Sequence, residues 1–182
     1  EKIHVLVRSE KKATNIKHPN VAIFEGDIMN KDSIRDAMQG CNKVYHLAAF
    51  AKVWAKDPKI YFDSNITATV NILEVAQEIG VSKVIVTSTA GVYGASVSDD
   101  ITETYVRDFD FFNEYESSKA ISESRIKDFV IAGLDVSIVS PTRVYGPYLI
   151  GQPQSVTQLI HKYVKGNWRI IPGDGTKIGN YV

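Results

Sequence analysis

The sequence predicts an α/β protein built on a doubly wound parallel sheet with helices on both faces. Two observations indicate this class. Short, continuous apolar segments alternate with segments of helical periodicity, and each apolar segment ends in small or polar residues. Strands buried on both faces form unbroken apolar runs, and the crossovers between parallel strands are usually helices. Ligands of such sheets bind beyond the carboxyl ends of the strands, so we expect a site there.

The predicted strands are short runs of apolar, mostly β-branched residues. In chain order they are 3–7, 21–24, 44–49, 83–88 and 134–139, with a further short strand at 169–171. Small or polar residues follow most of these runs, as expected where a strand stops at the edge of a sheet. No internal repeat, linker or low-complexity segment interrupts the pattern, so one domain is expected.

The predicted helices carry apolar residues three and four positions apart on one face. They span 32–38, 63–78, a segment that begins just before Tyr115, and a segment around 156–164. Asn113 precedes Glu116 by three residues, the spacing of an N-cap with its capping-box partner. Gly40, Gly80 and Gly133 stand where helix C-caps are expected.

The composition excludes several classes of function. Lysine plus arginine equals aspartate plus glutamate at 21 each, so charge gives no case for nucleic acid or an anionic membrane surface. No apolar run approaches the roughly 18 residues of a membrane span. Cys41 is the single cysteine, which fits a reducing cytoplasm. The four histidines are scattered without metal-ligand spacing, so no metal site is expected.

Tyr115 and Lys119 are four residues apart on a predicted helix, so both can meet one ligand. A free tyrosine has a pKa of about 10 and is a poor base at neutral pH. A neighbouring ammonium and the positive end of the helix dipole are expected to lower that pKa. On these residues alone, a core tyrosine beside a surface lysine is the commoner explanation.

Residues at other strand ends have chemical roles that fit a nucleotide. Arg8 can clamp a phosphate such as a ribose 2′-phosphate, or be a surface arginine. Asp27 can accept a hydrogen bond from an adenine amino group, or form a turn. Ala48 and Ala49 allow close approach of a cofactor, or reflect ordinary packing. The Thr89 hydroxyl can hold a substrate oxygen beside Tyr115, or be structural.

As a set, these motifs resemble the extended short-chain dehydrogenase/reductase family, the superfamily of NAD-dependent epimerases and dehydratases. The residues that carry the resemblance are Gly26-Asp27-Ile28, His46-Leu47-Ala48-Ala49, Asn65 with 69–74, 86–94, Tyr115 with Lys119, 141–147 and Gly173-Asp174-Gly175. The resemblance implies a Rossmann fold that binds NADP or NAD, and Thr89, Tyr115 and Lys119 as the catalytic set.

The resemblance also implies which residues contact the cofactor. They are Arg8, Asp27, Ile28, Leu47, Ala48, Ala49, Asn65, Thr87, Tyr115, Lys119, Pro141 and Val144. Arg8 favours NADP over NAD. The glycine-rich turn that follows the family's first strand is absent from these 182 residues. We therefore expect 1–182 to be a Rossmann domain incomplete at both ends, with a small substrate lobe starting at about 146.

The substrate loop 53–58 and the strand ending Val7-Arg8-Ser9 resemble the dihydroflavonol-4-reductase-like branch. Three further features speak against the dehydratases and the nucleotide-sugar epimerases. Ala90-Gly91 follow Thr89 where dehydratases have Asp-Glu, Arg143 stands where epimerases tend to have asparagine, and 176–181 contains no arginine for a diphosphate. The predicted activity is reduction of a carbonyl, or oxidation of an alcohol, on a small hydrophobic substrate. Alternatives are an NAD-dependent nucleotide-sugar epimerase and a non-catalytic dinucleotide-binding regulator.

The substrate pocket is expected to be aromatic, because Phe50, Trp54, Tyr93 and Tyr148 fall near the predicted strand ends. An ordinary core role for these side chains is nearly as good an explanation. Family members often form homodimers through helices equivalent to 63–78 and 115–132. The sequence thus predicts a small-molecule substrate and no nucleic-acid or membrane partner, while a homodimer is an option that the resemblance leaves open.

Overall fold

The computed structural model describes residues 1–52, 54–96, 100–146, 155–169, 174 and 181–182. Its internal contacts divide the chain into two units, Glu1–Ser140 and Pro141–Val182. The first unit holds the predicted sheet and the Tyr115 helix. The second contains one described helix, α5 (Ser155–Val164). The predicted strand at 169–171 falls mainly outside the described residues.

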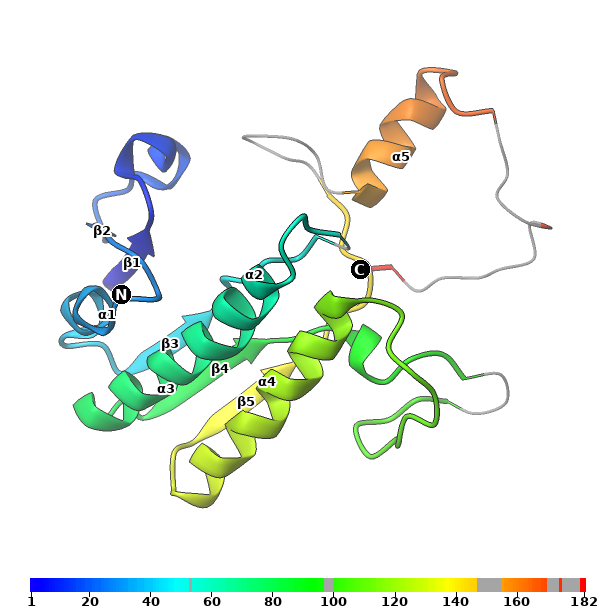
Figure 1. Cartoon of the computed structure of the whole chain (residues 1–182). Helices are drawn as coiled ribbons and strands as arrows, with labels where there is room; N and C mark the ends of the chain where they lie inside the picture. The colour runs from blue at the N-terminus through cyan, green and yellow to red at the C-terminus, as the bar shows by residue number, and fades with distance from the viewer. Residues whose placement is uncertain (53, 97–99, 147–154, 170–173, 175–180) are drawn as a thin grey trace. The chain divides into compact units, whose positions relative to one another are not determined.

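The strands of the first unit are all parallel, as predicted (Figure 1). Among the described residues they form two sheets. One pairs β1 (Ile3–Val7) with β2 (Val21–Glu25), and the other has the order β3 (Lys43–His46), β4 (Lys83–Thr87), β5 (Val136–Val139). The apolar pattern predicted the strands but could not specify their partners, because parallel pairing depends on distant segments.

The helices alternate with the strands. They are α1 (Lys31–Met38), α2 (Lys59–Tyr61), α3 (Ala68–Ile79) and α4 (Glu114–Ile131), joined by short 3-10 segments η1 (Glu10–Lys12), η2 (Thr14–Ile16) and η4 (Ala90–Val92). The predicted helix 63–78 starts earlier than expected and contains a π-helical turn, η3 (Phe62–Thr67). Periodicity cannot detect such a turn, because tertiary contacts of its side chains hold it.

The core lies between the second sheet and the helices α3 and α4, which run along one face of it in Figure 1. Leu73 on α3 and Val84 on β4 are fully buried, and Ile126 on α4 is 2% exposed. Burying a side chain of this size contributes roughly 1.5–3 kcal/mol of transfer free energy. The apolar faces predicted from sequence therefore meet here and fix α4 against β4 and β5.

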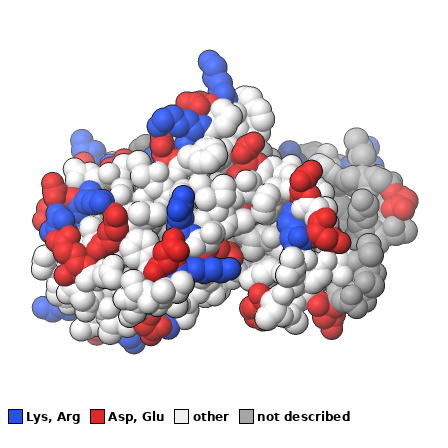
Figure 2. Space-filling view, turned by 60° about the horizontal axis from the view of Figure 1, so that its bottom comes forward, with Lys and Arg blue, Asp and Glu red and all other residues white. Residues whose placement is uncertain are grey.

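The surface carries both signs of charge, interspersed on the face shown in Figure 2. One exposed network connects α1 to α3, since Arg35 bonds Glu78 through Nε at 2.8 Å and through Nη2 at 3.0 Å. No described helix is long and apolar enough to cross a membrane. Among the described residues, no group of three His, Cys, Asp or Glu side chains could hold a metal ion.

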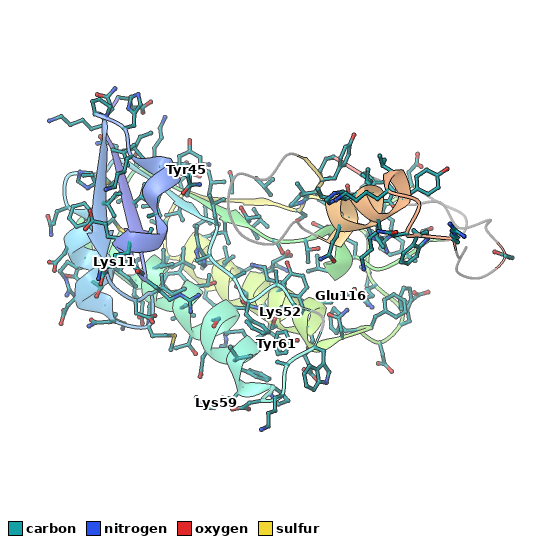
Figure 3. The ribbon with its side chains drawn as sticks, turned by 90° about the horizontal axis from the view of Figure 1, so that it is seen from above. Lys11, Tyr45, Lys52, Lys59, Tyr61 and Glu116 are labelled. Carbon is teal, nitrogen blue, oxygen red and sulfur yellow. The ribbon has the colours of Figure 1, made fainter. Side chains whose placement is uncertain are left out.

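Tyr61 fixes the segment that enters the long helix from β3. Its side chain is 2% exposed, and its hydroxyl donates to the Lys52 carbonyl oxygen at 2.8 Å. Figure 3 shows both residues beside the α2 segment. The Phe50 ring packs edge-on against Tyr61, with ring centroids 5.0 Å apart. The loop after β3 is thereby held against the start of the helix.

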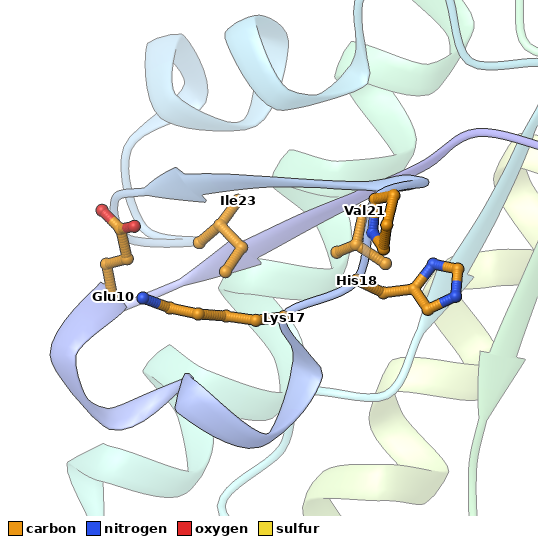
Figure 4. Close-up of a pocket in the computed structure, with 6 residues that line it drawn as sticks. Glu10, Lys17, His18, Val21 and Ile23 are labelled. Carbon is orange, nitrogen blue, oxygen red and sulfur yellow. The ribbon is translucent and has the colours of Figure 1, made fainter.

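The first sheet is covered on both faces. His4 points toward α1, where its Nδ1 lies 2.9 Å from the Ala37 carbonyl oxygen. Alternate strand residues point the opposite way, and there Val21 and Ile23 line a hollow of about 520 Å³ beside η1 and η2 (Figure 4). This hollow belongs to the connection between β1 and β2, and Glu10 in its lining accompanies the carboxyl end of β2, where its N–H donates to Glu25 Oε2 at 2.8 Å.

Candidate functional site

The helix α4 begins as the sequence predicts. Asn113 has an extended backbone, and its Oδ1 accepts from the Glu116 backbone N–H at 3.0 Å. Asn113 Nδ2 lies 3.4 Å from Glu116 Oε1, which brings the two side chains of the box together. Side-chain caps satisfy helix N–H groups that otherwise lack partners. The N-cap prediction is confirmed, and Tyr115 lies in the first turn of α4. The Glu116 carboxylate, predicted as the capping-box partner, accepts from the Phe112 backbone N–H at 3.3 Å.

Thr89 and Tyr115 come together at the end of β4. Thr89 caps η4, because its Oγ1 accepts from the Gly91 N–H at 3.2 Å. Hydrogen bonding from Thr89 lowers the pKa of the Tyr115 phenol, so the two side chains face each other. A helix and a strand that are separate in the sequence therefore deliver two hydroxyls to one point.

Lys119 lies one turn further along α4 and is 2% exposed. Its Nζ donates to the Thr87 carbonyl oxygen at 2.8 Å. Burial lowers the pKa of Lys119, and the charge of Glu123 partly offsets that effect. The lysine is thus anchored on the last residue of β4, two positions before Thr89.

The pKa of Tyr115 moves opposite to the sequence prediction. Burial raises this pKa above its usual value, and the hydrogen bond with Thr89 offsets only part of the rise. Lys119 is not among the groups that set it, because its ammonium is directed at the Thr87 carbonyl. The predicted lowering of the Tyr115 pKa by Lys119 is therefore wrong for this arrangement of the chain, in which Tyr115 is a neutral phenol at pH 7.

Asn65 connects the loop after β3 to the Tyr115 helix. Its side chain is fully buried in η3, where Oδ1 accepts from the Phe50 N–H at 2.7 Å. Its Nδ2 donates to the Phe50 carbonyl at 3.1 Å and to Ser118 Oγ at 2.9 Å. Ser118 Oγ donates in turn to the Tyr115 carbonyl at 2.8 Å. These bonds fix the backbone of Tyr115, while contact of Asn65 with a cofactor stays a prediction.

Two residues of this network were not among the predicted site residues. Ser118 is 2% exposed and lies between Tyr115 and Lys119 on the same helix. Its position inside this segment is the sequence feature by which it could have been found. His46 is 4% exposed, and its Nε2 lies 3.0 Å from Thr69 Oγ1. Burial lowers the pKa of His46 to about 4, and Lys119 contributes to the shift. His46 is therefore neutral at pH 7 and serves as an internal hydrogen-bonding group.

The predicted cofactor residues of the first sheet lie just beyond β1 and β2. Arg8 and Asp27 are exposed, and Ile28 is partly buried. Asp27 Oδ1 accepts from the Met29 N–H at 2.9 Å, so part of this carboxylate forms a turn. The Ile28 carbonyl lies 3.3 Å from Asn71 Nδ2 on α3, which ties this loop to the helix that follows β3.

Beyond β3 the chain presents one apolar side chain and two small ones. Leu47 is 72% exposed, and Ala48 and Ala49 are exposed as well. These three predicted residues are therefore accessible from solvent, and their contact with a cofactor stays a prediction.

The remaining predicted residues are dispersed. Pro141 and Val144 belong to the second unit, in which Arg143 forms a parallel bridge with Tyr181. Trp54 is 74% exposed. Residues 53 and 148, expected in the substrate loop and pocket, lie outside the described residues. The aromatic pocket predicted from sequence thus stays a prediction.

The first unit places several predicted cofactor and catalytic residues at its strand ends. It combines an exposed arginine and aspartate beyond β1 and β2, an exposed apolar surface beyond β3, and a paired hydroxyl and phenol beyond β4. Parallel α/β sheets bind ligands at this edge. The fold and site together define a dinucleotide-binding α/β protein of Rossmann type.

Comparison with known proteins gives the family. The profile of the NAD dependent epimerase/dehydratase family matches residues 1–182. The chain belongs to this family, within the extended short-chain dehydrogenase/reductases, and the family supports NAD(P) as its cofactor.

Individual relatives cover several reactions. Sterol demethylase protein B of Methylococcus capsulatus is 31% identical over 175 residues, 95% of this chain and 53% of the relative. A dihydroflavonol 4-reductase-like protein of Synechocystis is 27% identical over 165 residues, 90% of this chain and 48% of that protein. The chain spans about half the length of these relatives.

One solved structure shows the same fold with the cofactor bound. The dTDP-glucose 4,6-dehydratase DesIV of Streptomyces venezuelae, as a double mutant with NAD and DAU, has a TM-score of 0.79 and 26% identity. The match covers 93% of this chain and 53% of the dehydratase. The predicted Rossmann fold and the predicted family are confirmed.

Proposed function

We propose that this protein is an NAD(P)-dependent oxidoreductase that interconverts a carbonyl and an alcohol on a small hydrophobic substrate. The observation that carries the proposal is the approach of the Thr89 segment to the Tyr115 helix beyond β4, where a Cβ on Gly91 would lie 3.1 Å from Glu116 Cγ and Thr89 acts on the Tyr115 phenol. It pairs an acid with a second hydroxyl at the edge where the family binds its cofactor. Both groups can then contact one substrate oxygen.

Tyr115 acts as the general acid when a carbonyl is reduced. Its raised pKa keeps the phenol protonated at neutral pH, which suits proton donation to the oxygen of the product alcohol. Thr89 donates a second hydrogen bond to that oxygen and holds it in line. The nicotinamide, when bound, supplies the hydride.

Lys119 binds the nicotinamide ribose in this proposal. Its ammonium has three donors, and one of them is used by the Thr87 carbonyl. The remaining donors are available to the ribose in this proposal.

Arg8 supports NADP as the preferred cofactor. Its exposed guanidinium directly follows β1, where a ribose 2′-phosphate of a dinucleotide on this edge is expected. A hydrophobic substrate is supported by the sterol-related name of one relative and by the exposed Trp54 ring. The exact carbonyl compound depends on parts of the protein beyond this unit.

A nucleotide-sugar epimerase is the second candidate, and the family itself favours it because it includes such enzymes. The two functions differ in how they hold the cofactor. A reductase must exchange NADP with solvent in each turnover, whereas an epimerase regenerates NAD in place. A regulatory protein without catalysis is the third candidate, and it has no use for the paired phenol and hydroxyl.

The deciding experiment measures how the purified wild-type protein retains and exchanges its cofactor. Thermal unfolding with NADP, NAD and UDP-sugars ranks the ligands, because a ligand that binds only the folded state raises the melting temperature. NADPH consumption with a panel of hydrophobic carbonyl compounds then tests turnover. We expect the largest shift with NADP and turnover of at least one carbonyl. NAD released only on denaturation, with a UDP-sugar shift, would overturn the reductase in favour of the epimerase.

A further inference from the structure

We infer that Arg107 is a positioning residue that sets the relation between Thr89 and Tyr115. This inference rests on the proposed function, because it assigns a role relative to that pair. Arg107 lies in the segment between η4 and α4, outside every predicted site motif. Its side chain is only 8% exposed, although arginine is rarely so buried without specific partners.

The Arg107 guanidinium donates to three carbonyl oxygens. Nη1 donates to Gly91 O at 2.7 Å, Nε to Phe109 O at 2.8 Å, and Nη2 to Asp110 O at 2.6 Å. Only a planar group with several fixed donors can satisfy such divergent acceptors at once. The guanidinium therefore acts as a rigid junction within this loop.

The same guanidinium contacts the start of α4. Arg107 Nη1 lies 3.4 Å from Glu116 Oε2, and the Glu116 side chain is 16% exposed. Glu116 Oε2 also accepts from the Phe112 N–H at 3.3 Å. Figure 3 labels Glu116 at the beginning of α4. Because this ion pair is shielded from water, it is screened by salt less than a surface pair.

The two ends of this junction adjoin the two proposed catalytic residues. Gly91 follows Thr89 by two positions, and its N–H is the group that Thr89 Oγ1 accepts from. Glu116 directly follows Tyr115. A Cβ on Gly91 would lie 3.1 Å from Glu116 Cγ, so the loop and the helix are in close contact here. A shift of Arg107 must therefore move Thr89 against Tyr115.

Aromatic rings hold the guanidinium in place. Its Cζ lies 4.6 Å from the ring centroid of Phe109, 4.4 Å from that of Phe111 and 5.4 Å from that of Phe112. Such cation–π contacts strengthen when the cation is shielded from water. Three rings leave the side chain little freedom, which is the property that a positioning residue requires.

Replacing Arg107 by lysine tests the inference, because R107K keeps the charge and loses the divergent donors. The first measurement is the titration of Tyr115 by ultraviolet difference spectroscopy, with Y115F subtracted to isolate its phenol from the other tyrosines. R35K is the matched control, since Arg35 also bonds carboxylates but joins α1 to α3, far from Tyr115 in the chain. E116Q is a milder second variant that removes only the charge of the partner.

We expect R107K to raise the pKa of Tyr115 further, because a weakened bond to Thr89 leaves burial less opposed. We expect E116Q to shift it in the same direction by less, and R35K to leave it unchanged. In a turnover assay, R107K should lower kcat by about tenfold to a hundredfold, as misplacement of reacting groups does, with KM for the cofactor within about twofold.

A lower melting temperature with an unchanged Tyr115 titration in R107K would overturn the inference and leave Arg107 a purely structural residue. If R107K does not fold, E116Q decides by the same titration. The titration needs no substrate. Absence of carbonyl reductase activity would therefore refute the proposed function. The positioning role of Arg107 would still be confirmed or refuted by the titration of Tyr115.

Discussion

The Lys119 ammonium donates a hydrogen bond to the Thr87 carbonyl oxygen at 2.8 Å and so fastens α4 to the last residue of β4. This bond brings the lysine and the end of the strand together before any ligand contributes. It also explains why Lys119 does not lower the pKa of Tyr115 within the chain. The lysine therefore combines a structural bond with the cofactor contact that we propose for it.

Tyr115→Phe removes the proposed acid and leaves the ring in place. We expect the turnover of a carbonyl substrate to fall by at least about a hundredfold, the lower range of general acid catalysis. Cofactor affinity should stay within a few fold, because the ring and Lys119 remain. Steady-state kinetics and cofactor titration measure both, with Y163F on the exposed face of α5 as the control. Undiminished turnover in Y115F would refute the assignment of Tyr115.

Arg8→Ala tests the cofactor preference. A hydrogen bond to a charged group contributes about 1.5–3 kcal/mol, which corresponds to roughly tenfold to a hundredfold in affinity. We expect the Kd for NADP to rise by that factor and the Kd for NAD to stay unchanged. Arg125→Ala, at an exposed position on α4, is the control. Equal loss of both affinities, or a wild-type preference for NAD, would contradict the role of Arg8.

His46→Gln tests the buried imidazole through the pH dependence of stability. The pKa of His46 is about 4 in the folded chain and 6.5 as a free group, so between these values the unfolded state binds more protons. The stability that the buried neutral His46 contributes is fully present above pH 6.5. It is lost as the pH falls toward 4, and the total loss in the free energy of unfolding is roughly 3 kcal/mol.

Urea unfolding of the wild type and H46Q at several pH values measures this contribution. H46Q should be less stable at pH 7 and should show a shallower decline below pH 6.5. His161→Gln, at an exposed position on α5, should keep the wild-type slope. Parallel curves for wild type and H46Q would show that the pKa of His46 is the same in the folded and unfolded chain.

Leu73→Ala tests the core that holds α3 against the sheet. Leu73 is fully buried, and leucine-to-alanine changes at such sites cost about 2–5 kcal/mol in the free energy of unfolding. Leu159→Ala on α5, where the side chain is 44% exposed, should cost much less. Denaturant unfolding measures both variants. A similar loss in the free energy of unfolding for both variants would show that Leu73 does not belong to the core that unfolds cooperatively.

Much of the arrangement followed from local patterns. Asn113 was predicted as a cap from its spacing to Glu116 alone, and the hydrogen bonds agree because capping involves only neighbouring residues. The parallel strands were predicted from unbroken apolar runs. The π-helical turn at η3 was not predicted, because it depends on the contacts of Asn65 with Phe50 and Ser118, residues distant in sequence.

The α/β class, the family, and the position of Tyr115 and Lys119 on one helix follow from the order of residues alone, because periodicity, caps and motif order are properties of neighbouring residues. The pairing of the strands, the bond from Lys119 to Thr87 and the raised pKa of Tyr115 came from the folded chain. Desolvation and hydrogen bonding across the fold depend on which distant groups surround a side chain. The role of Arg107 was likewise accessible only once Gly91 and Glu116 were seen to meet around it.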